Sequence, residues 1–341
     1  MALTPSVFLS TSHDPYVNLA AEEWFFHHRE PEHAVLFFCR NLPTVIIGRN
    51  QNPWRECDVE ALPSLGVRLA RRMSGGGTVY HDLGNLNFSF ILPRTATELD
   101  TVPELVARAL AQLGIRPVVT PRRGLEVAGR KISGTAFWLT SRNLLYHGTL
   151  LVASDLERVA RCLYVQTPGF ATHAVTSVRS PVVNLCDLVP QITMKKTRRA
   201  VTDALAAICA APAPASLPFP WPGVVADPEF AAAAAAHASW EWRFGRTPPF
   251  TFTLGPGPVP ELRQAVFSVQ AGRIVAAEVS VARRYQDLIP ALREALHGKP
   301  FGATPLAQAV AALAGTRPDR AAELRQLADW FAAGLRSAPA P

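Results

Sequence analysis

The sequence lacks any uninterrupted apolar run of about 18 residues, the length that a transmembrane helix requires. It also has no long arginine-rich run, which argues against nucleic acid as a partner. Charged residues make up only 18% of the chain and hydrophobic residues 48%, which is typical of a globular protein and excludes a disordered one. The net charge of +7 is explained by an acidic partner, by an anionic small molecule or by chance.

Cysteines are few, and none of their spacings is short enough for a metal site or a disulfide framework. We therefore expect reduced thiols in an intracellular protein and no bound metal ion. Because the first basic residue is Arg29, the N-terminal residues resemble neither a mitochondrial transit peptide nor a secretory signal. The expectation is a cytoplasmic protein, or a chain given without its presequence. The cysteines are Cys39, Cys57, Cys162, Cys186 and Cys209.

Segment 71–85 combines charge, backbone freedom and hydrogen-bonding groups more densely than any other part of the sequence. Its three consecutive glycines, at 75–77, permit positive φ angles and let a ligand approach the main chain closely. Successive N–H groups in such a turn can bind an anion, and Arg71 and Arg72 just upstream offer planar donors for carboxylate or phosphate. On the triple glycine alone, an ordinary tight turn explains the pattern equally well.

The segments on either side of these glycines have the two-residue period of strands. Residues 67–72 alternate and place Arg71 and Arg72 on opposite faces, and residues 86–91 alternate as well. The pattern predicts a hairpin-like strand, loop and strand. This disfavours the dinucleotide-binding fold, in which a helix follows the glycines, and no Lys-Ser or Lys-Thr closes the run as in a P-loop.

A second polar stretch, 125–136, predicts two short strands around an Ala128-Gly129 turn, with Lys131 early in the second strand. A further strand at 144–152 carries His147, Gly148 and Thr149 in its middle. A glycine inside a strand often marks the close approach of a ligand or of another backbone.

The remaining segments predict an α+β protein. Asp14 followed by Pro15 predicts the start of a helix, and residues 210–222, rich in proline and alanine, predict a surface connection. Residues 240–250 resemble a junction, so we expect a large domain at 1–246 and a small α+β domain at 247–341. The other predicted elements are strands at 34–39 and 44–47, helices at 101–113 and 230–237, a hairpin at 266–281, and helices at 287–296, 306–313 and 320–335.

Two motifs together resemble the lipoate–protein ligase A family. The first is Arg71-Arg72-x-Ser74-Gly75-Gly76-Gly77-x-Val79-x-His81-Asp82-x-Gly84-Asn85, and the second is Gly129-x-Lys131-Ile132-Ser133-Gly134-Thr135-Ala136. Segments 48–57 and 240–248 are similar to those of its mitochondrial lipoyltransferase (lipoyl amidotransferase) subgroup. The resemblance runs from about residue 7 through the junction.

This resemblance implies a large catalytic domain of mixed β-sheets flanked by helices, akin to biotin protein ligase, followed by a small accessory domain. It implies transfer of a lipoyl group from lipoyl-AMP, or from a lipoylated carrier such as H protein, to a lysine ε-amine. The acceptors would be acidic lipoyl domains of 2-oxoacid dehydrogenase E2 subunits and the glycine-cleavage H protein. It further implies a monomer in the mitochondrial matrix with no tightly bound cofactor; ATP and Mg²⁺ would be needed only by a full ligase.

The resemblance also assigns the site. Attack of an amine on an acyl adenylate needs a cation near both carbonyl and phosphate, and Lys131 is the candidate. His81 could act on the incoming amine or be structural beneath the glycine turn, Asp82 is expected to fix that turn, and Arg49 contacts phosphate or pairs with a carboxylate. Residues implied to line the lipoyl-AMP pocket are Tyr80, Arg123, Thr149, Val178 and Ser180, with Arg72, Ser74, Gly75, Gly76 and Gly77 shaping the lipoyl tunnel.

Three alternatives remain open. A full lipoate–protein ligase would make lipoyl-AMP itself from lipoate, ATP and magnesium. An octanoyltransferase would need a cysteine nucleophile, and no cysteine lies in or beside the lysine motif or the 144–152 strand. A non-catalytic protein that binds lipoyl domains is disfavoured because Lys131 is present with its whole motif.

Overall fold

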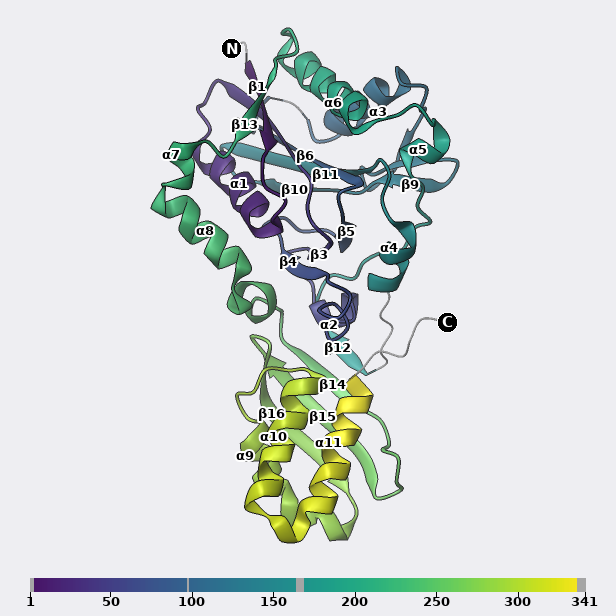
Figure 1. The fold of residues 1–341 in the computed structure, drawn as a ribbon, viewed down its shortest axis with the longest axis vertical. Coiled ribbons are helices and arrows are strands. Elements are labelled where there is room, and N and C mark those ends of the chain that lie inside the picture. Colours follow the sequence, from purple (N-terminus) through teal and green to yellow (C-terminus); the bar gives the residue numbers. More distant parts are fainter. Residues whose placement is uncertain (1–2, 97, 164–168, 336–341) are drawn as a thin grey trace. The chain divides into compact units, whose positions relative to one another are not determined.

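A computed structural model describes residues 3–96, 98–163 and 169–335 (Figure 1). The chain forms two compact units: unit 1 comprises Met1–Arg49, Val67–Ala160 and Ser177–Ser239, and unit 2 comprises Asn50–Gly66, Arg161–Thr176 and Trp240–Pro341. Two stretches that precede residue 177 thus belong to unit 2, and the expected domain boundary at 246/247 stays a prediction. Within the described ranges, no helix has the length and hydrophobicity needed to cross a membrane.

Unit 1 is built around a six-stranded mixed sheet with the order β10-β11-β6-β2-β1-β13. β1 is parallel to β2 and β13, whereas β6 is antiparallel to both β2 and β11, and β10 is antiparallel to β11. The strands are β1 (Thr4–Ser10), β2 (His33–Cys39), β6 (Asn85–Pro93), β10 (Thr135–Leu139), β11 (Asn143–Leu151) and β13 (Ser216–Phe219).

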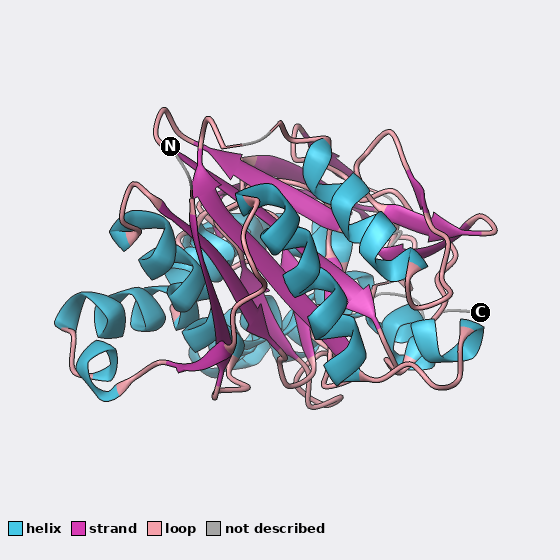
Figure 2. Ribbon diagram, turned by 90° about the horizontal axis from the view of Figure 1, so that it is seen from above, coloured by secondary structure: helices cyan, strands magenta, loops and turns pink. Residues whose placement is uncertain are grey.

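Helices cover both faces of this sheet, as Figures 1 and 2 show. In β2, Leu36 and Phe38 pack in one core with α3 (Thr101–Ala111) and α6 (Met194–Cys209). The alternate residues Val35 and Phe37 pack on the other face with α1 (Pro15–His28) and α8 (Pro228–Ala238). The sequence of a strand that is buried on both faces is a continuous apolar run, which is why residues 34–39 predict a strand.

The helix predicted after Asp14 is confirmed. The Asp14 carboxylate accepts a hydrogen bond from the Tyr16 N–H at 2.8 Å, and Pro15 occupies the first helical turn, where its missing N–H costs nothing.

The hairpin predicted around the glycines is wrong. β3 (Thr44–Ile47) lies between β4 (Arg68–Arg71), which runs parallel to it, and β5 (Val79–His81), which runs antiparallel. Because β3 pairs along both edges, the strands before and after the glycine loop are not neighbours, and the loop passes the end of β3. A Cβ on Gly48, just after β3, would lie 2.4 Å from the Gly76 carbonyl oxygen.

A second three-stranded sheet carries the lysine motif, in the order β7 (Val118–Val119), β8 (Leu125–Val127) and β9 (Arg130–Ser133). The predicted turn between the last two is confirmed: Ala128 has φ 50° and Gly129 has φ 72°, the two positive values that a type I′ hairpin turn requires. Lys131 pairs with Glu126 across the hairpin.

The expectation of an unpacked surface connection at 210–222 is wrong. Residues 216–219 form β13, which extends the main sheet beside β1, and Phe219 is fully buried. Pro218 is tolerated because β13 is an edge strand, where one row of N–H groups has no strand to donate to. Three further helices between residues 156 and 225 are short: α4 (Leu156–Cys162), α5 (Leu185–Leu188) and α7 (Pro222–Val225).

Unit 2 contains an antiparallel sheet of four strands, β12 (Phe170–Thr172), β14 (Phe250–Leu254), β15 (Leu262–Gln270) and β16 (Arg273–Val281). The predicted β15–β16 hairpin and the three predicted helices are confirmed. The helices of unit 2 are α2 (Pro53–Glu56), α9 (Ile289–Leu296), α10 (Ala303–Thr316) and α11 (Ala321–Leu335), with a π-helical turn at Glu241–Gly245 and 3₁₀ turns at Arg283–Leu288 and Pro318–Arg320.

The segment 50–66 is held in unit 2 by apolar and polar contacts. The Trp54 ring lies 5.7 Å from that of Phe250 and 5.5 Å from that of Phe301, measured between centroids. The Glu60 carboxylate accepts hydrogen bonds from the Ala303 N–H and the Thr304 hydroxyl, both at 2.9 Å, at the start of α10. Such a carboxylate also suits the positive end of the helix dipole.

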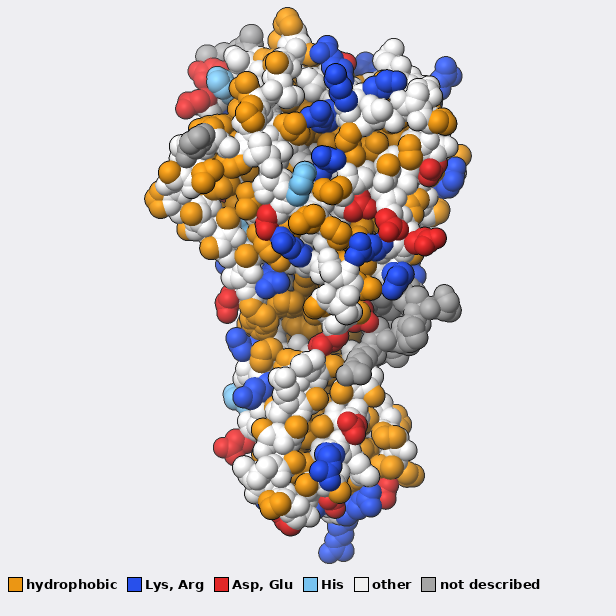
Figure 3. Space-filling view, in the orientation of Figure 1, with side chains coloured by type: hydrophobic (Ala, Val, Ile, Leu, Met, Phe, Trp, Pro, Cys, Tyr) orange, Lys and Arg blue, Asp and Glu red, His pale blue; other side chains and the backbone are white. Residues whose placement is uncertain are grey.

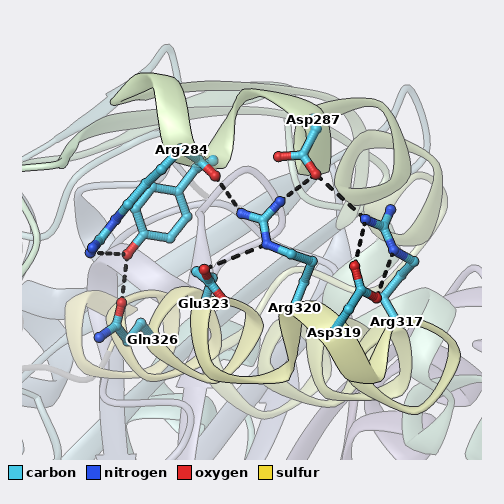
Figure 4. A network of polar contacts seen from close by, with 8 residues as sticks. Arg284, Asp287, Arg317, Asp319, Arg320, Glu323 and Gln326 are labelled. Carbon is cyan, nitrogen blue, oxygen red and sulfur yellow. Dashed lines mark hydrogen bonds and ion pairs between the residues drawn. The ribbon is translucent and has the colours of Figure 1, made fainter.

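A polar network joins α11 to the 3₁₀ turn before α9 (Figure 4). Asp287 pairs with Arg320 and, at 3.5 Å, with Arg317. The Tyr285 hydroxyl donates to Gln326 Oε1 at 2.5 Å. These contacts fix the end of the helical layer of unit 2.

Candidate active site

Unit 1 has a cavity of about 820 Å³, within the range of about 300–1,000 Å³ typical of small-molecule sites. At one end the lining residues are exposed, among them Arg122, Phe137 and Val178. At the other end they are buried, among them Asn41 and His81. The cavity wall therefore includes both enclosed and solvent-exposed side chains, so the cavity suits a molecule that is partly enclosed by the protein.

Strand alternation explains why polar side chains of the main sheet gather on the face that α1 covers. In the β6–β11 register His147 lies opposite Ser89, and Thr149 lies opposite Asn87. Their sequence neighbours, such as Phe88, point into the core on the other face. An apolar strand thus presents His147 and Thr149 to the cavity.

Arg72 organises the glycine loop. Its Nη2 donates to the carbonyl oxygens of Gly75 and Gly77, both at 2.6 Å, and its Nη1 donates to the Ile46 oxygen at 3.2 Å. Burial lowers the pKa of Arg72 to about 10. Since its donors are directed at loop carbonyls, Arg72 shapes the cavity wall instead of offering an unpaired charge to a ligand.

Arg71 lies on the opposite face, as predicted. It is fully buried and its Nη1 donates to the carbonyl oxygens of Gly48 at 3.2 Å and Arg49 at 2.9 Å, and burial lowers its pKa to about 10. The Arg49 N–H donates to the Ser74 oxygen at 2.8 Å. Both arginines of the motif therefore hold the chain around the glycines.

Behind the glycine loop, Ser74, His147 and Glu22 form a buried chain of hydrogen bonds. The Ser74 hydroxyl lies 2.7 Å from His147 Nε2, and His147 Nδ1 lies 3.0 Å from Glu22 Oε1. The Ser89 hydroxyl also donates to Glu22. Burial raises the pKa of the Glu22 carboxyl, but His147 and Ser89 outweigh it, so the pKa is lowered and the carboxylate stays ionised.

A second polar chain reaches the buried end of the cavity from α1. Asn18 Nδ2 donates to Asn41 Oδ1 at 2.7 Å, and Asn41 Nδ2 lies 2.9 Å from His81 Nδ1. Burial, with the positive charge of Arg72, lowers the pKa of His81 to about 3, so the imidazole is neutral. Asp82 fixes the following turn as expected, because its Oδ1 accepts from the Gly84 N–H at 2.8 Å.

Lys131 is positioned by main-chain hydrogen bonds. Its N–H donates to the Pro181 oxygen at 2.7 Å and its oxygen accepts from the Val183 N–H at 3.1 Å. These bonds tie β9 to the segment that carries Val178 and Ser180 to the cavity wall.

The Lys131 ammonium, by contrast, has no hydrogen-bond or ion-pair partner within the described part of the chain. It lies next to Gly134, where a Cβ would be 3.3 Å from Nζ. Burial lowers the pKa of Lys131, Glu126 opposes this, and Arg122 and Arg72 reinforce it. The site thus holds a partly desolvated cation that is not committed to the protein.

Thr149 and Arg123 also border the cavity. The Thr149 hydroxyl accepts from the Gly134 N–H at 3.1 Å, which fixes the junction of β9 and β10. Arg123 has a left-handed φ of 62°, and its guanidinium pairs with Asp100 at 2.6 Å and stacks over the Phe137 ring at 5.6 Å. A non-glycine residue in this conformation is uncommon and points to a functional constraint.

The structure brings most of the predicted site residues together. Ser74 and Tyr80 are buried off the cavity wall: Ser74 lies behind the loop, and Tyr80 points away because its neighbours Val79 and His81 face the cavity. What each residue does in a reaction stays a prediction. Those on the wall are Arg72, Gly75, Gly76, Gly77, Arg123, Lys131, Thr149, Val178 and Ser180.

Sequence reasoning missed several wall residues, including Glu22, Asn41 and Cys39. Glu22 carries a usable signal, because it lies three residues after Leu19 and four before Phe26 on the buried face of α1. Cys39 is distant from both motifs in the sequence, yet it lies on the cavity wall. The absence of cysteines near the lysine motif and the 144–152 strand therefore does not mean that the cavity has none. Burial and the nearby Glu22 charge raise the pKa of the Cys39 thiol well above the usual value, which makes it a poor nucleophile.

The fold and the site combine a cavity of small-molecule size with a lysine ammonium on its wall, as in an enzyme that binds a small molecule. A family model described as the lipoyl protein ligase A/B catalytic domain matches residues 14–206, more than half of the chain. The protein therefore belongs to the lipoyl protein ligase A/B family, as the two motifs predicted, and it is a lipoyl-transferring ligase or transferase. The match to the mitochondrial lipoyltransferase subgroup stays a prediction.

Solved structures share the fold. The chain is similar to LipL1 of P. falciparum in complex with lipoate, at 21% identity over 97% of this chain and 100% of that one, with a TM-score of 0.63. It is similar to lipoate-protein ligase A bound with ATP, at 24% identity over 71% and 98%, with a TM-score of 0.58. A third similar structure is the bipartite lipoate protein ligase from T. acidophilum, described with its E2 lipoyl domain. The sequence identity is 22% over 71% of this chain and 96% of that one, with a TM-score of 0.59. The predicted fold class, α+β with mixed sheets and flanking helices, is confirmed.

Proposed function

We propose that the protein is a lipoyltransferase that moves a lipoyl group from lipoyl-AMP, or from a lipoylated H protein, to a lysine ε-amine on a lipoyl domain of a 2-oxoacid dehydrogenase E2 subunit. The observation that carries this proposal is the Lys131 ammonium, which lies beside the cavity and has no hydrogen-bond or ion-pair partner among the residues that the structure describes. A desolvated cation of this kind is what an acyl adenylate requires.

In the proposed reaction the acceptor amine attacks the acyl carbonyl carbon. The new C–N bond forms, the bond from that carbon to the phosphate oxygen breaks, AMP leaves with the electron pair, and the attacking nitrogen gives up one proton to water. Negative charge grows first on the carbonyl oxygen and then on the phosphate. Lys131 would stabilise both, and Arg122 and Arg123 at the exposed end of the cavity would add positive charge near the phosphate.

Charge also supports the choice of acceptor. The net charge of +7 favours encounter with an acidic lipoyl domain, and Lys and Arg side chains occur at many places on the face in Figure 3. The T. acidophilum relative, which is described with its own E2 lipoyl domain, supports the same type of partner. By the resemblance to mitochondrial lipoyltransferases, we place this activity in the mitochondrial matrix and expect a monomer.

The main alternative is a full ligase, which is favoured by the similarity to a ligase bound with ATP. One experiment separates the two: an apo lipoyl domain is incubated with the protein and lipoyl-AMP, lipoylated H protein, or lipoate with ATP and Mg²⁺, and its mass is followed. We expect the acceptor to be modified with lipoyl-AMP or with lipoylated H protein, and to stay unmodified with lipoate, ATP and Mg²⁺. Modification with lipoate and ATP would instead identify a full ligase, and an unmodified acceptor in every mixture would leave a non-catalytic binding protein.

A further inference from the structure

Among the described residues, two nitrogen atoms of buried side chains that line the cavity have no hydrogen-bond partner: His81 Nε2 and Asn87 Nδ2. His81 is 8% exposed and lines the cavity, and within the described residues its Nε2 has no hydrogen-bond partner. A buried polar atom is normally paired, so one that faces a cavity without a partner points to a ligand.

The hydrogen-bond chain from α1 determines which atom of the ring carries the hydrogen. The Ser12 carbonyl oxygen only accepts, so the Asn18 atom 3.2 Å from it is Nδ2, and this nitrogen also donates to Asn41 Oδ1 at 2.7 Å. The Asn41 amide is thereby oriented with Nδ2 toward His81 Nδ1, at 2.9 Å. Because an amide nitrogen only donates, Nδ1 is the acceptor, and a neutral imidazole then carries its hydrogen on Nε2.

Neighbouring acceptors at this end are already engaged. The Glu22 carboxylate accepts from Ser89 and pairs with His147, and the Asn87 Oδ1 accepts from Asn85 Nδ2 at 2.8 Å. An acceptor for His81 Nε2–H is therefore supplied by whatever fills the cavity.

His81 and Lys131 mark different parts of the cavity. The Lys131 ammonium lies next to Gly134, where a Cβ would be 3.3 Å from Nζ, whereas the His81 ring is held by the Asn41 amide at 2.9 Å. If the reacting carbonyl lies at Lys131, the far end of the acyl group extends toward His81, along a wall that includes the apolar Leu19 and Ile46.

We propose that His81 is a specificity-determining residue, whose Nε2–H donates to an acceptor at the far end of the acyl group. The site then prefers an acyl chain that ends in a cyclic disulfide, whose sulfur atoms are weak acceptors, over a straight saturated chain such as octanoyl. A saturated chain leaves the buried N–H without a partner, which is unfavourable. This inference rests on the proposed function and adds a substrate preference to it.

The test compares kcat/KM for lipoyl-AMP and octanoyl-AMP with one apo lipoyl domain. The wild type is expected to prefer lipoyl-AMP by about fivefold, the effect of one modest hydrogen bond. His81→Phe, which keeps a ring but no donor, should bring the ratio close to one through a loss with lipoyl-AMP. His81→Gln, which restores an N–H donor, should recover part of the preference. An unchanged ratio in a folded His81→Phe variant would overturn the proposal.

Two measurements on the wild type keep the inference separate from the proposed function. Calorimetry with free lipoate and free octanoate tests the preference even if no acceptor is modified, and equal affinities would overturn it. If His81→Phe does not fold, ¹⁵N-histidine labelling replaces it. The His81 Nε2 resonance should then move with lipoate and stay in place with octanoate; equal shifts would refute the assignment.

Discussion

Ser74 and His147 are separated by 73 residues in the sequence, yet their hydroxyl and Nε2 atoms lie 2.7 Å apart. This hydrogen bond connects the glycine loop to the middle of the main sheet. Since His147 also binds the Glu22 carboxylate, a single imidazole holds together the loop, β11 and α1. The stiffness of the glycine loop therefore depends on residues outside its motif.

Replacing this imidazole should destabilise the protein. His147→Leu leaves the Glu22 carboxylate buried with one partner fewer, and we expect a loss of about 3 kcal/mol in the free energy of unfolding, measured by urea denaturation. His173→Leu, at an exposed position, is the matched control and should change stability by less than about 0.5 kcal/mol. Equal effects of the two substitutions would show that the buried chain is not stabilising.

Lys131→Met should separate activity from stability. Because the ammonium makes no hydrogen bond to the described protein, the melting temperature should hardly change, while transfer to an apo lipoyl domain falls by at least about 100-fold. Lys196→Met is the control, since Lys196 Nζ donates to the Gln191 oxygen at an exposed site. Transfer at the wild-type rate by Lys131→Met would remove this lysine from the mechanism.

Gly48→Ala should displace the glycine loop from a position outside it. The added Cβ would lie 2.4 Å from the Gly76 oxygen, a backbone atom that cannot simply rotate away, so we expect a loss of about 1–3 kcal/mol and slower transfer. Gly255→Ala has open space around its Cβ and serves as the control. Thermal melting and the mass assay report the two effects; wild-type values for Gly48→Ala would mean that the loop yields without cost.

Acid should destabilise the protein through His81. Its folded pKa is about 3, below the ordinary value of 6.5, so between these values the unfolded chain binds a proton that the folded protein does not. Stability from this group is therefore complete above about pH 6.5 and falls by up to about 1.4 kcal/mol per pH unit as the pH is lowered. Urea denaturation at pH 6.5 and 5 should show a smaller decline for His81→Phe than for the wild type, and parallel declines would contradict the shift.

Local patterns in the sequence predicted local structure well. Features that depend only on neighbouring residues are present in the structure as predicted. They include the helix start at Asp14-Pro15, the Ala128-Gly129 turn and the two-residue periods of the strands. The motifs likewise located most of the cavity wall, because their glycines and charges are contiguous.

The failures concern contacts between distant segments. No local pattern shows that β3 pairs along both edges, so the sequence predicts a hairpin turn at the glycine loop where the structure has none. Cys39 and Asn41 reach the cavity only because β2 joins β6 in the main sheet, and β13 was missed because a short edge strand containing proline has little strand signal.

Unit 2 is built from segments that are far apart in the sequence, and this affects how the chain folds during its synthesis. Trp54 is made early, yet its ring packs on Phe250 and Phe301, which leave the ribosome only near the end of translation. Until Phe250 and Phe301 have been made, the apolar surface of the indole and of the rest of segment 50–66 stays unburied, as is common in incomplete chains. The Trp54 indole is thus buried in its final place only after both Phe250 and Phe301 have been made, so segment 50–66 cannot complete its packing before the C-terminal part of unit 2 folds.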